Sequence, residues 1–315
     1  MCDLLARYDL EVLVAVTPAL RSGAARVFRT LADRGIHAAV WPMIDDAEGR
    51  WASSATLTTY VAFVDDLTAE LARANVTVDE VAIDLEPPFA AAKAASHGAW
   101  LGPVRTALAL REDFRSASTS LRSFVERLGE GTRVSCAAVP LVLLDEAQKP
   151  PSSPPGAAYV PAVERPFFQA LLGTPVDGVQ FGSVSIMAYT TILEGWSRGV
   201  LDRRASVGVL GECARLARVR YASRASISLG TVGVGAFTDE PIYRSPVELV
   251  EDVAMARAHG VDDLSLFDLG GIVRRGPPEA WLEAFVSNEG PRVALPRRVR
   301  LGSACLRALA RVRFP

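Results

Sequence analysis

The chain has few of the residues that build metal centres and disulfide frameworks. Its 315 residues include only four cysteines and three histidines. No two cysteines have CxxC spacing, and all four lie far apart, so neither a zinc site nor a disulfide framework is predicted. The histidines show no ligand spacing, and each is interpreted as structural or solvated. We therefore expect no metal and no other cofactor. The residues concerned are Cys2, Cys136, Cys213, Cys305, His37, His97 and His259.

Several longer patterns are also missing. No apolar run is long enough to span a membrane. Met1-Cys2-Asp3 opens the chain without the charged and apolar regions of a signal peptide. We leave the compartment open, with secretion expected if the natural protein starts further upstream. Nothing resembles a glycine-rich phosphate loop, which weighs against a doubly wound nucleotide-binding fold.

Charge is unevenly distributed. Seven of the 34 basic residues and none of the 36 acidic ones fall in residues 291–315, which leaves 27 basic and 36 acidic side chains in residues 1–290. A body with a net charge of about −9 is a poor nucleic-acid binder. We expect the basic tail, residues 288–315, to be a helix docked on the acidic body or a loosely ordered end; a membrane-surface helix stays open as an alternative.

Strand-like and helix-like segments alternate along the chain. Half of the residues are hydrophobic and 22% are charged, which allows a sizeable core. Each apolar run of five to seven residues is followed by a segment with helical spacing, and repeated βα units indicate a parallel sheet. Strands are predicted at Glu11–Val16, His37–Trp41, Val81–Leu85, Arg133–Val139, Val184–Tyr189, Ala225–Gly230 and Leu264–Leu269. Helices are predicted at Leu20–Arg34, Leu57–Ala74, 99–129, Phe167–Leu172, Val207–Ala222, Pro246–His259 and Pro278–Val286.

These units predict an α/β protein with a (β/α)8 TIM barrel over residues 1–287. No linker divides the chain before residue 287, which favours one barrel over two domains. A (β/α)8 barrel needs eight strands, and this chain supplies seven. Residues 1–10 have the pattern of a helix end running into a strand. We therefore expect the barrel to lack its first strand in this chain.

The strand that ends at Pro87 carries the most informative pattern. Its apolar side chains alternate with Ala82, Asp84 and Glu86, so the two acids share one face at the carboxyl end of the strand. Buried carboxylates are costly unless they are paired, hydrogen-bonded or used in chemistry. The pattern predicts an active-site pair. An ion pair with an arginine of a neighbouring element is the alternative.

Three motifs resemble the family-18 glycoside hydrolases, the chitinase-like barrels. Asp79-x-x-Ala82-x-Asp84-x-Glu86 resembles the DxxDxDxE motif of that family, with three of its four acids. Met187-Ala188-Tyr189 resembles the Met-x-Tyr of its sixth strand, and residues 266–271, Leu-Phe-Asp-Leu-Gly-Gly, resemble its last strand. With the first strand missing, these motifs fall on strands four, six and eight, in the family's order.

The resemblance implies a carbohydrate substrate and a role for each matching residue. Glu86 matches the general acid that protonates the leaving sugar oxygen. Asp84 matches the residue that orients the acetamido group of an N-acetylhexosamine, which acts as the nucleophile, and Tyr189 matches a hydrogen-bond donor to that group. The other expected substrate contacts are Asp79, Trp41, Met187, Phe267 and Asp268.

Departures from the pattern leave other functions open. Ala82 replaces the middle Asp of the motif, Phe267 replaces a Trp, and Thr190 stands where many members have an Asp. A chitinase-like barrel that binds a glycan without cleaving it is therefore one alternative. A barrel enzyme of other chemistry, with a metal on Asp84 and Glu86, is another.

Loops after the strands supply further candidates. Residues 140–166 contain seven prolines, which stiffen a long loop into a cleft wall or a solvated excursion. The loop after Gly230 carries Asp239 and Glu240, either of which has the chemistry to meet a sugar hydroxyl. Trp196, like Trp41, is a candidate for stacking on a sugar face, with core packing as the commoner fate of a tryptophan. The oligomeric state is not predicted.

Overall fold

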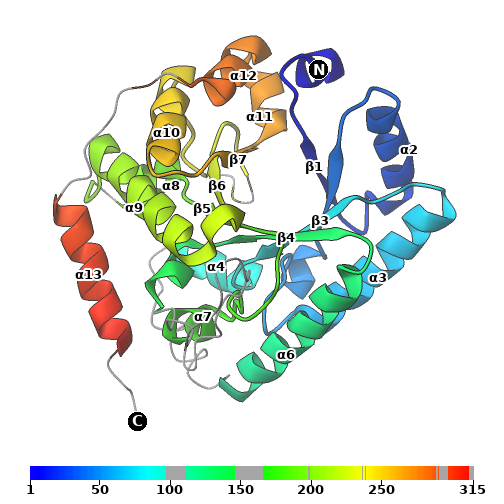
Figure 1. Ribbon diagram of the computed structural model, residues 1–315, viewed down its shortest axis with the longest axis horizontal. Helices are drawn as coiled ribbons and strands as arrows, with labels where there is room; N and C mark the ends of the chain where they lie inside the picture. Colours follow the sequence, from blue (N-terminus) through cyan, green and yellow to red (C-terminus); the bar gives the residue numbers. More distant parts are fainter. Residues whose placement is uncertain are drawn as a thin grey trace. The chain divides into compact units, whose positions relative to one another are not determined.

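The chain forms two compact units, each described here by itself. The computed structural model describes residues 1–96, 111–145, 166–197, 199–235, 237, 239–288, 290 and 297–311. The first unit comprises Met1–Ala138 and Ala147–Ser183, and the second comprises Val139–Glu146 and Val184–Pro315 (Figure 1).

Four parallel strands form the first unit's sheet. They are β1 (Val12–Val16), β2 (Ala38–Pro42), β3 (Glu80–Leu85) and β4 (Arg133–Ala138), and each pairs with the next in the chain. Helices α2, α3 and α6 form an outer layer beside these strands (Figure 1). The unit's helices are α1 (Cys2–Arg7), α2 (Arg21–Ala32), α3 (Leu57–Arg73), α4 (Phe89–Ser96), α6 (Arg111–Leu128) and α7 (Phe167–Leu172), with a 3₁₀ turn η1 (Asp46–Glu48).

Apolar periodicity explains how α3 and β3 bury their side chains. Tyr60, Val64, Leu67 and Leu71 recur every three or four residues of α3, and all four are buried. Burying one such aliphatic side chain contributes about 1.5–3 kcal/mol. In β3 the odd-numbered residues, Val81, Ile83 and Leu85, are fully buried as well. The acids of β3 therefore lie on the opposite face of the strand from this core.

The second unit repeats the same architecture with three strands. Strands β5 (Ser183–Met187), β6 (Ala225–Gly230) and β7 (Asp263–Phe267) are parallel and pair in chain order. Helices α8, α9 and α10 contact β6, which is buried throughout. The unit's helices are α8 (Thr190–Trp196), α9 (Arg203–Tyr221), α10 (Pro246–Ala258), α11 (Leu269–Arg275), α12 (Pro278–Val286) and α13 (Arg297–Arg311), with 3₁₀ turns η2 (Pro140–Leu144) and η3 (Ala222–Arg224).

Hydroxyl groups line one face of the second unit's sheet. Ser185, Ser228 and Ser265 come from three successive strands, and their Oγ atoms form hydrogen bonds of 2.8 and 2.6 Å. Ser226 adds a bond of 3.2 Å to Ser185. Residues of the other parity, such as Ile227, bury apolar side chains on the opposite face. The hydroxyl face satisfies its own polar groups, which a buried face requires.

These findings confirm the predicted fold class. The chain is an α/β protein in which parallel strands follow one another in chain order with helices between them. Singly wound βα units of this kind build the (β/α)8 barrel, and the described residues supply seven of its eight strands. All seven predicted strands are present. The extent of the barrel over residues 1–287 stays a prediction.

The helices differ from the prediction in a few places. Helices α8 and α11 begin directly after β5 and β7 and were not expected. The helix predicted over residues 99–129 is confirmed for Arg111–Leu128. Most of the proline-rich loop, residues 146–165, lies outside the described residues. In the basic tail, Arg297–Arg311 is helical and α13 contacts α9. None of the helices in the described ranges is both long and apolar enough to cross a membrane.

Candidate active site

Two carboxyl groups occupy the carboxyl end of β3, as the sequence predicts. Asp84 is the penultimate residue of the strand and is only 3% exposed, and Glu86 follows the strand and is half-buried. A parallel strand of an α/β barrel carries its functional residues at this end. Because side chains alternate along a strand, both acids lie on one face at the carboxyl end of β3, as predicted.

Asp84 is held by hydrogen bonds and not by an ion pair. Its carboxyl group is hydrogen-bonded to the side chains of Trp41 and Glu86. Its Oδ1 atom is buried without a hydrogen-bond partner among the described residues. In the same part of the chain, no lysine or arginine lies within ion-pair distance of Asp84. The described residues thus give no support to the ion-pair alternative for Asp84, and its Oδ1 has no partner among them.

Burial is the largest influence on the pKa of Asp84. Burial raises the pKa of Asp84 to about 7, while hydrogen bonds from Trp41 and Glu86 and the charge of Arg50 act in the opposite direction. An ionised carboxylate only accepts hydrogen bonds. The hydrogen bond between Asp84 and Glu86 therefore requires one proton on the pair.

The segment between β2 and α3 fixes the backbone around the acids. The amide of Ala52 donates to the carbonyl oxygen of Asp84 at 3.0 Å, and the amide of Glu86 donates to that of Ala52 at 3.2 Å. Further on, the amide of Phe89 donates to the carbonyl oxygen of Gly49 at 3.2 Å. Residues 49–52 thus run alongside residues 84–89. Both acids sit on backbone that is hydrogen-bonded from the side.

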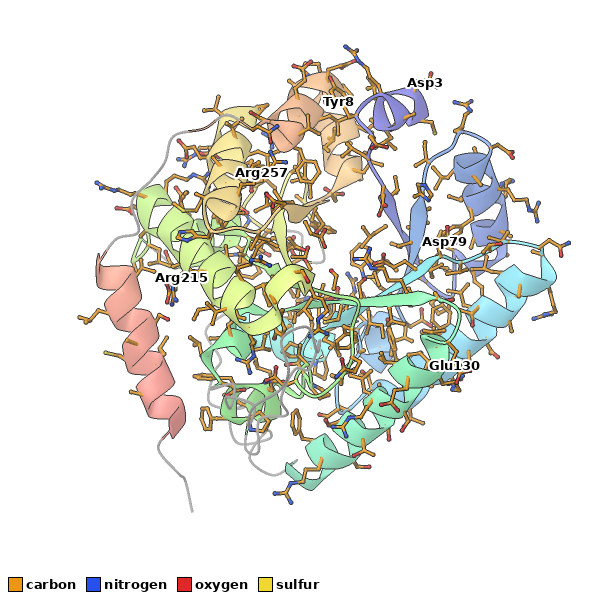
Figure 2. The ribbon with its side chains drawn as sticks, viewed as in Figure 1. Asp3, Tyr8, Asp79, Glu130, Arg215 and Arg257 are labelled. Carbon is orange, nitrogen blue, oxygen red and sulfur yellow. The ribbon has the colours of Figure 1, made fainter. Side chains whose placement is uncertain are left out.

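The residues before Asp84 include the two other motif positions, Ala82 and Asp79. Ala82 shares the face of Asp84 and is buried, so the position of the missing acid is next to the pair. Glu80 accepts a hydrogen bond from Ser135. Asp79 immediately precedes the strand (Figure 2), and its carbonyl oxygen accepts from the amide of Arg133 at 2.9 Å. At about 3.3 Å per residue, Asp79 is ~16 Å from Asp84. Its role in substrate binding stays a prediction.

The predicted residues of the second unit form an aromatic pair. Tyr189 lies at the amino end of α8, and Phe267 is the last residue of β7. Their rings stack with centroids 6.1 Å apart and planes 19° from parallel. A Cβ on Gly230 would lie 3.0 Å from the Tyr189 ring, so glycine at the end of β6 makes room for the pair. Met187 ends β5 and is buried.

Asp268 organises its own loop. Its Oδ1 accepts hydrogen bonds from the amides of Gly271 and Gly233, both at 3.1 Å, and so caps helix α11. Its Oδ2 lies 3.7 Å from a guanidinium nitrogen of Arg274. This carboxyl group is half-buried and already has several partners. A substrate contact by Asp268 stays a prediction.

Sequence patterns missed a buried polar network next to Tyr189. The hydroxyl of Thr190 donates to Asp252 at 2.5 Å and accepts from Arg203 at 2.7 Å. Arg203 also donates to Asp252 at 2.8 Å, as does the Tyr243 hydroxyl at 2.6 Å. Burial raises the pKa of Asp252 to about 6, against the charge of Arg203. The network fixes the residue that follows Tyr189. Its members are distant in sequence, so no local pattern could have identified it.

A second aromatic pair lies on the loop after β6. Trp196 of α8 and Phe237 have ring centroids 5.8 Å apart, and both are half-buried. Glu240 accepts from the amides of Gly235 and Phe237 at 2.7 and 3.0 Å, so its carboxyl group shapes the loop. A Cβ on Gly235 would lie 2.6 Å from the Phe267 ring. The loop therefore connects this pair to the stacked pair of Tyr189 and Phe267.

The candidate residues thus form two sets, one in each unit. The first holds Asp84, Glu86 and Trp41, and Arg50 belongs to the segment 49–52 that runs alongside residues 84–89. The second holds Tyr189 and Phe267. Within the described ranges, no group of three or more histidine, cysteine or acidic side chains has the geometry to hold a metal ion.

Comparisons with known proteins give only distant similarities. No protein-family model matches the chain, and no curated protein matches it significantly. The PgaB (BpsB) glycoside hydrolase domain from Bordetella bronchiseptica is 14% identical, with a TM-score of 0.47, over 84% of this chain and 80% of that one. A GH18 chitinase from Pseudoalteromonas aurantia is 12% identical, with a TM-score of 0.43, over 87% and 98%. D-psicose 3-epimerase in the presence of D-fructose is 10% identical, with a TM-score of 0.40, over 98% and 91%.

Proposed function

We propose that the chain is a glycoside hydrolase that acts on a glycan containing N-acetylhexosamine, with Glu86 as its general acid. The observation that carries the proposal is the placement of two carboxyl groups at the carboxyl end of β3, with Asp84 buried in the strand and Glu86 half-buried directly after it. Two neighbouring carboxyl groups that share one proton can perform general acid catalysis, since one group donates the proton while the other stays ionised.

Each group of the pair has a distinct task. Glu86 is half-buried and follows the strand, so its proton is closer to solvent and to a substrate than that of Asp84. It protonates the leaving sugar oxygen. The unpartnered Oδ1 of Asp84 accepts the N–H of the acetamido group and orients its carbonyl oxygen toward the anomeric carbon. The acetamido carbonyl oxygen attacks the anomeric carbon while the bond from that carbon to the leaving oxygen breaks. Water later hydrolyses the cyclic intermediate.

Aromatic side chains contribute binding. The family resemblance implies that the Tyr189 hydroxyl is a hydrogen-bond donor to an acetamido group. Phe267 stacks on Tyr189, and Trp196 with Phe237 extends the aromatic surface of that unit. Flat, amphipathic rings match the C–H faces of sugars. This support for a carbohydrate ligand is independent of the carboxyl pair.

Hydrolysis of chromogenic glycosides by wild-type protein and Glu86→Gln tests the proposal. The glutamine keeps the shape of the side chain but has no proton to transfer. General acid catalysis contributes about 10²–10⁴-fold, and turnover should fall by that factor while affinity holds. Glu130→Gln, which makes the same change at an exposed glutamate, is the matched control. Equal turnover in Glu86→Gln and the control would contradict the proposal.

A glycan-binding protein without turnover is the second candidate function. Ala82 favours it, because this buried position beside Asp84 lacks the acid that the family motif places there. Binding measurements on a glycan array distinguish the two functions. Binding without hydrolysis of any bound glycan would establish this second function and exclude the first.

A further inference from the structure

Helix α13 presents an apolar face on the side away from its neighbour α9. On the docked side, the Ser303 hydroxyl donates a hydrogen bond of 3.1 Å to Oε1 of Glu212, and the two helices contact each other (Figure 1). At 3.6 residues per turn, Leu301 lies roughly 200° around the helix from Ser303. Its side chain is 70% exposed. The residues that share its face, three, four and seven positions later, are exposed too: Ala304, Cys305 and Ala308.

This arrangement inverts the usual polarity of a helix on a protein surface. Such a helix turns its apolar stripe toward the core and its polar residues toward water. In α13 the polar Ser303 meets the body of the unit, where the buried carboxylate of Glu212 accepts two hydrogen bonds from Arg215 at 2.9 and 2.8 Å. Leu301 and Leu306 belong instead to the exposed large apolar side chains. The outward face of α13 is thus left with apolar surface to cover.

The charge of the helix indicates what covers it. The sequence of α13 contains five arginines and no acid. Guanidinium groups pair well with phosphate, and helices that combine leucines with many basic residues lie in the surface of anionic bilayers. We propose that α13 is a membrane-surface helix that binds the anionic headgroups of a lipid bilayer and places Leu301 against the acyl chains. This role does not depend on the proposed glycan activity.

Other partners match only part of this surface. A second copy of the chain in a symmetric contact would bring the same arginine-rich helix against itself, and the like charges would repel. Nucleic acid offers phosphates, but its backbone gives Leu301 no apolar layer. A bilayer surface offers both chemistries. Residues 1–290 carry 27 basic and 36 acidic side chains, so an anionic surface repels the body and attracts the chain through its basic end.

Co-sedimentation of the full chain with lipid vesicles tests the proposal. Wild-type protein should bind vesicles of phosphatidylcholine mixed with phosphatidylglycerol but not vesicles of phosphatidylcholine alone. Leu301→Glu should weaken binding about tenfold or more, because it puts a charge where acyl chains and anionic headgroups meet the helix. Val247→Glu adds the same charge at a 66% exposed position of α10 and should bind like wild-type protein. Arg300→Gln should weaken binding about fivefold, since it removes one charge from the contact.

A fluorophore on Cys305 reports contact with the acyl region directly. Cys136 and Cys213 are buried, so Cys2→Ser leaves Cys305 as the accessible thiol for labelling. A polarity-sensitive dye at this position should shift its emission to shorter wavelength when anionic vesicles are added, and far less when duplex DNA is added. No sedimentation with anionic vesicles, or no emission shift, would overturn the proposal. Equal vesicle binding by Leu301→Glu and Val247→Glu would also overturn it, and tight binding of both to duplex DNA would then identify a nucleic-acid surface.

Discussion

Replacing Asp84 by asparagine should remove a pH-dependent cost from the folded state. The wild-type side chain is fully buried, and burial raises its pKa from an ordinary 3.8 to about 7. A difference of about 3 pH units corresponds to roughly 4 kcal/mol, at ~1.4 kcal/mol per unit. Asparagine keeps the size and one acceptor oxygen but does not ionise. The variant therefore lacks the cost of burying a charge.

The direction follows from linkage. A carboxyl group whose folded-state pKa is raised stabilises the protein fully below its unfolded pKa, and that contribution is lost as the pH rises through the folded-state value. The stability of wild-type protein relative to Asp84→Asn should therefore fall between about pH 4 and pH 8, by roughly 4 kcal/mol in total. Because Asp84 shares a proton with Glu86, the curve reports the titration of the pair.

Urea denaturation across this pH range, followed by circular dichroism, measures the difference. Asp239→Asn serves as the control, since it removes a carboxyl group from an exposed position. A difference between wild-type protein and Asp84→Asn that is flat from pH 4 to pH 8 would refute the reasoning. So would a wild-type stability that rises with pH relative to Asp84→Asn, because it would mean that the folded state favours the charged form of Asp84.

Four further substitutions probe the surroundings of the two residue sets. Ala82→Asp should raise turnover or shift the pH optimum of glycoside hydrolysis, since it restores a third carboxyl group on the face of Asp84; unchanged kinetics in a folded variant would place Ala82 outside the site. Arg203→Met should cost about 3–5 kcal/mol in denaturant unfolding, because it leaves the buried Asp252 without its cation. Trp196→Ala and Phe237→Ala should weaken binding of oligosaccharides more than of monosaccharides in calorimetry; equal effects on both would argue against an extended sugar contact.

The fold was predictable because its signals are local. Each strand is a short apolar run, and Val81, Ile83 and Leu85 alternate with the acids in a pattern that only an extended strand satisfies. Helices α8 and α11 were missed because they start within one or two residues of a strand end. The sequence does carry a local signal for α11. Asp268 lies three residues before Gly271, and its side chain accepts a hydrogen bond from the Gly271 amide and so caps the helix.

The site was predictable only in part, for a physical reason. Strand alternation places Asp84 and Glu86 together, but their neighbours come from elsewhere in the chain. Trp41 belongs to another strand, and no local pattern pointed to its hydrogen bond with Asp84; its contact with a sugar stays a prediction. Arg50 has a left-handed backbone conformation and lies over the ring of Phe89, almost 40 residues away, which no periodicity encodes.

The most direct test of the central claim compares leaving groups in Glu86→Gln. A general acid matters most when the leaving oxygen is a poor leaving group and needs a proton. The account predicts that Glu86→Gln loses about 10²–10⁴-fold in turnover on an alkyl or sugar leaving group but far less on a dinitrophenyl one, with an unchanged melting temperature. Equal losses on both substrates, or a loss explained by unfolding, would contradict the assignment of Glu86 as the general acid.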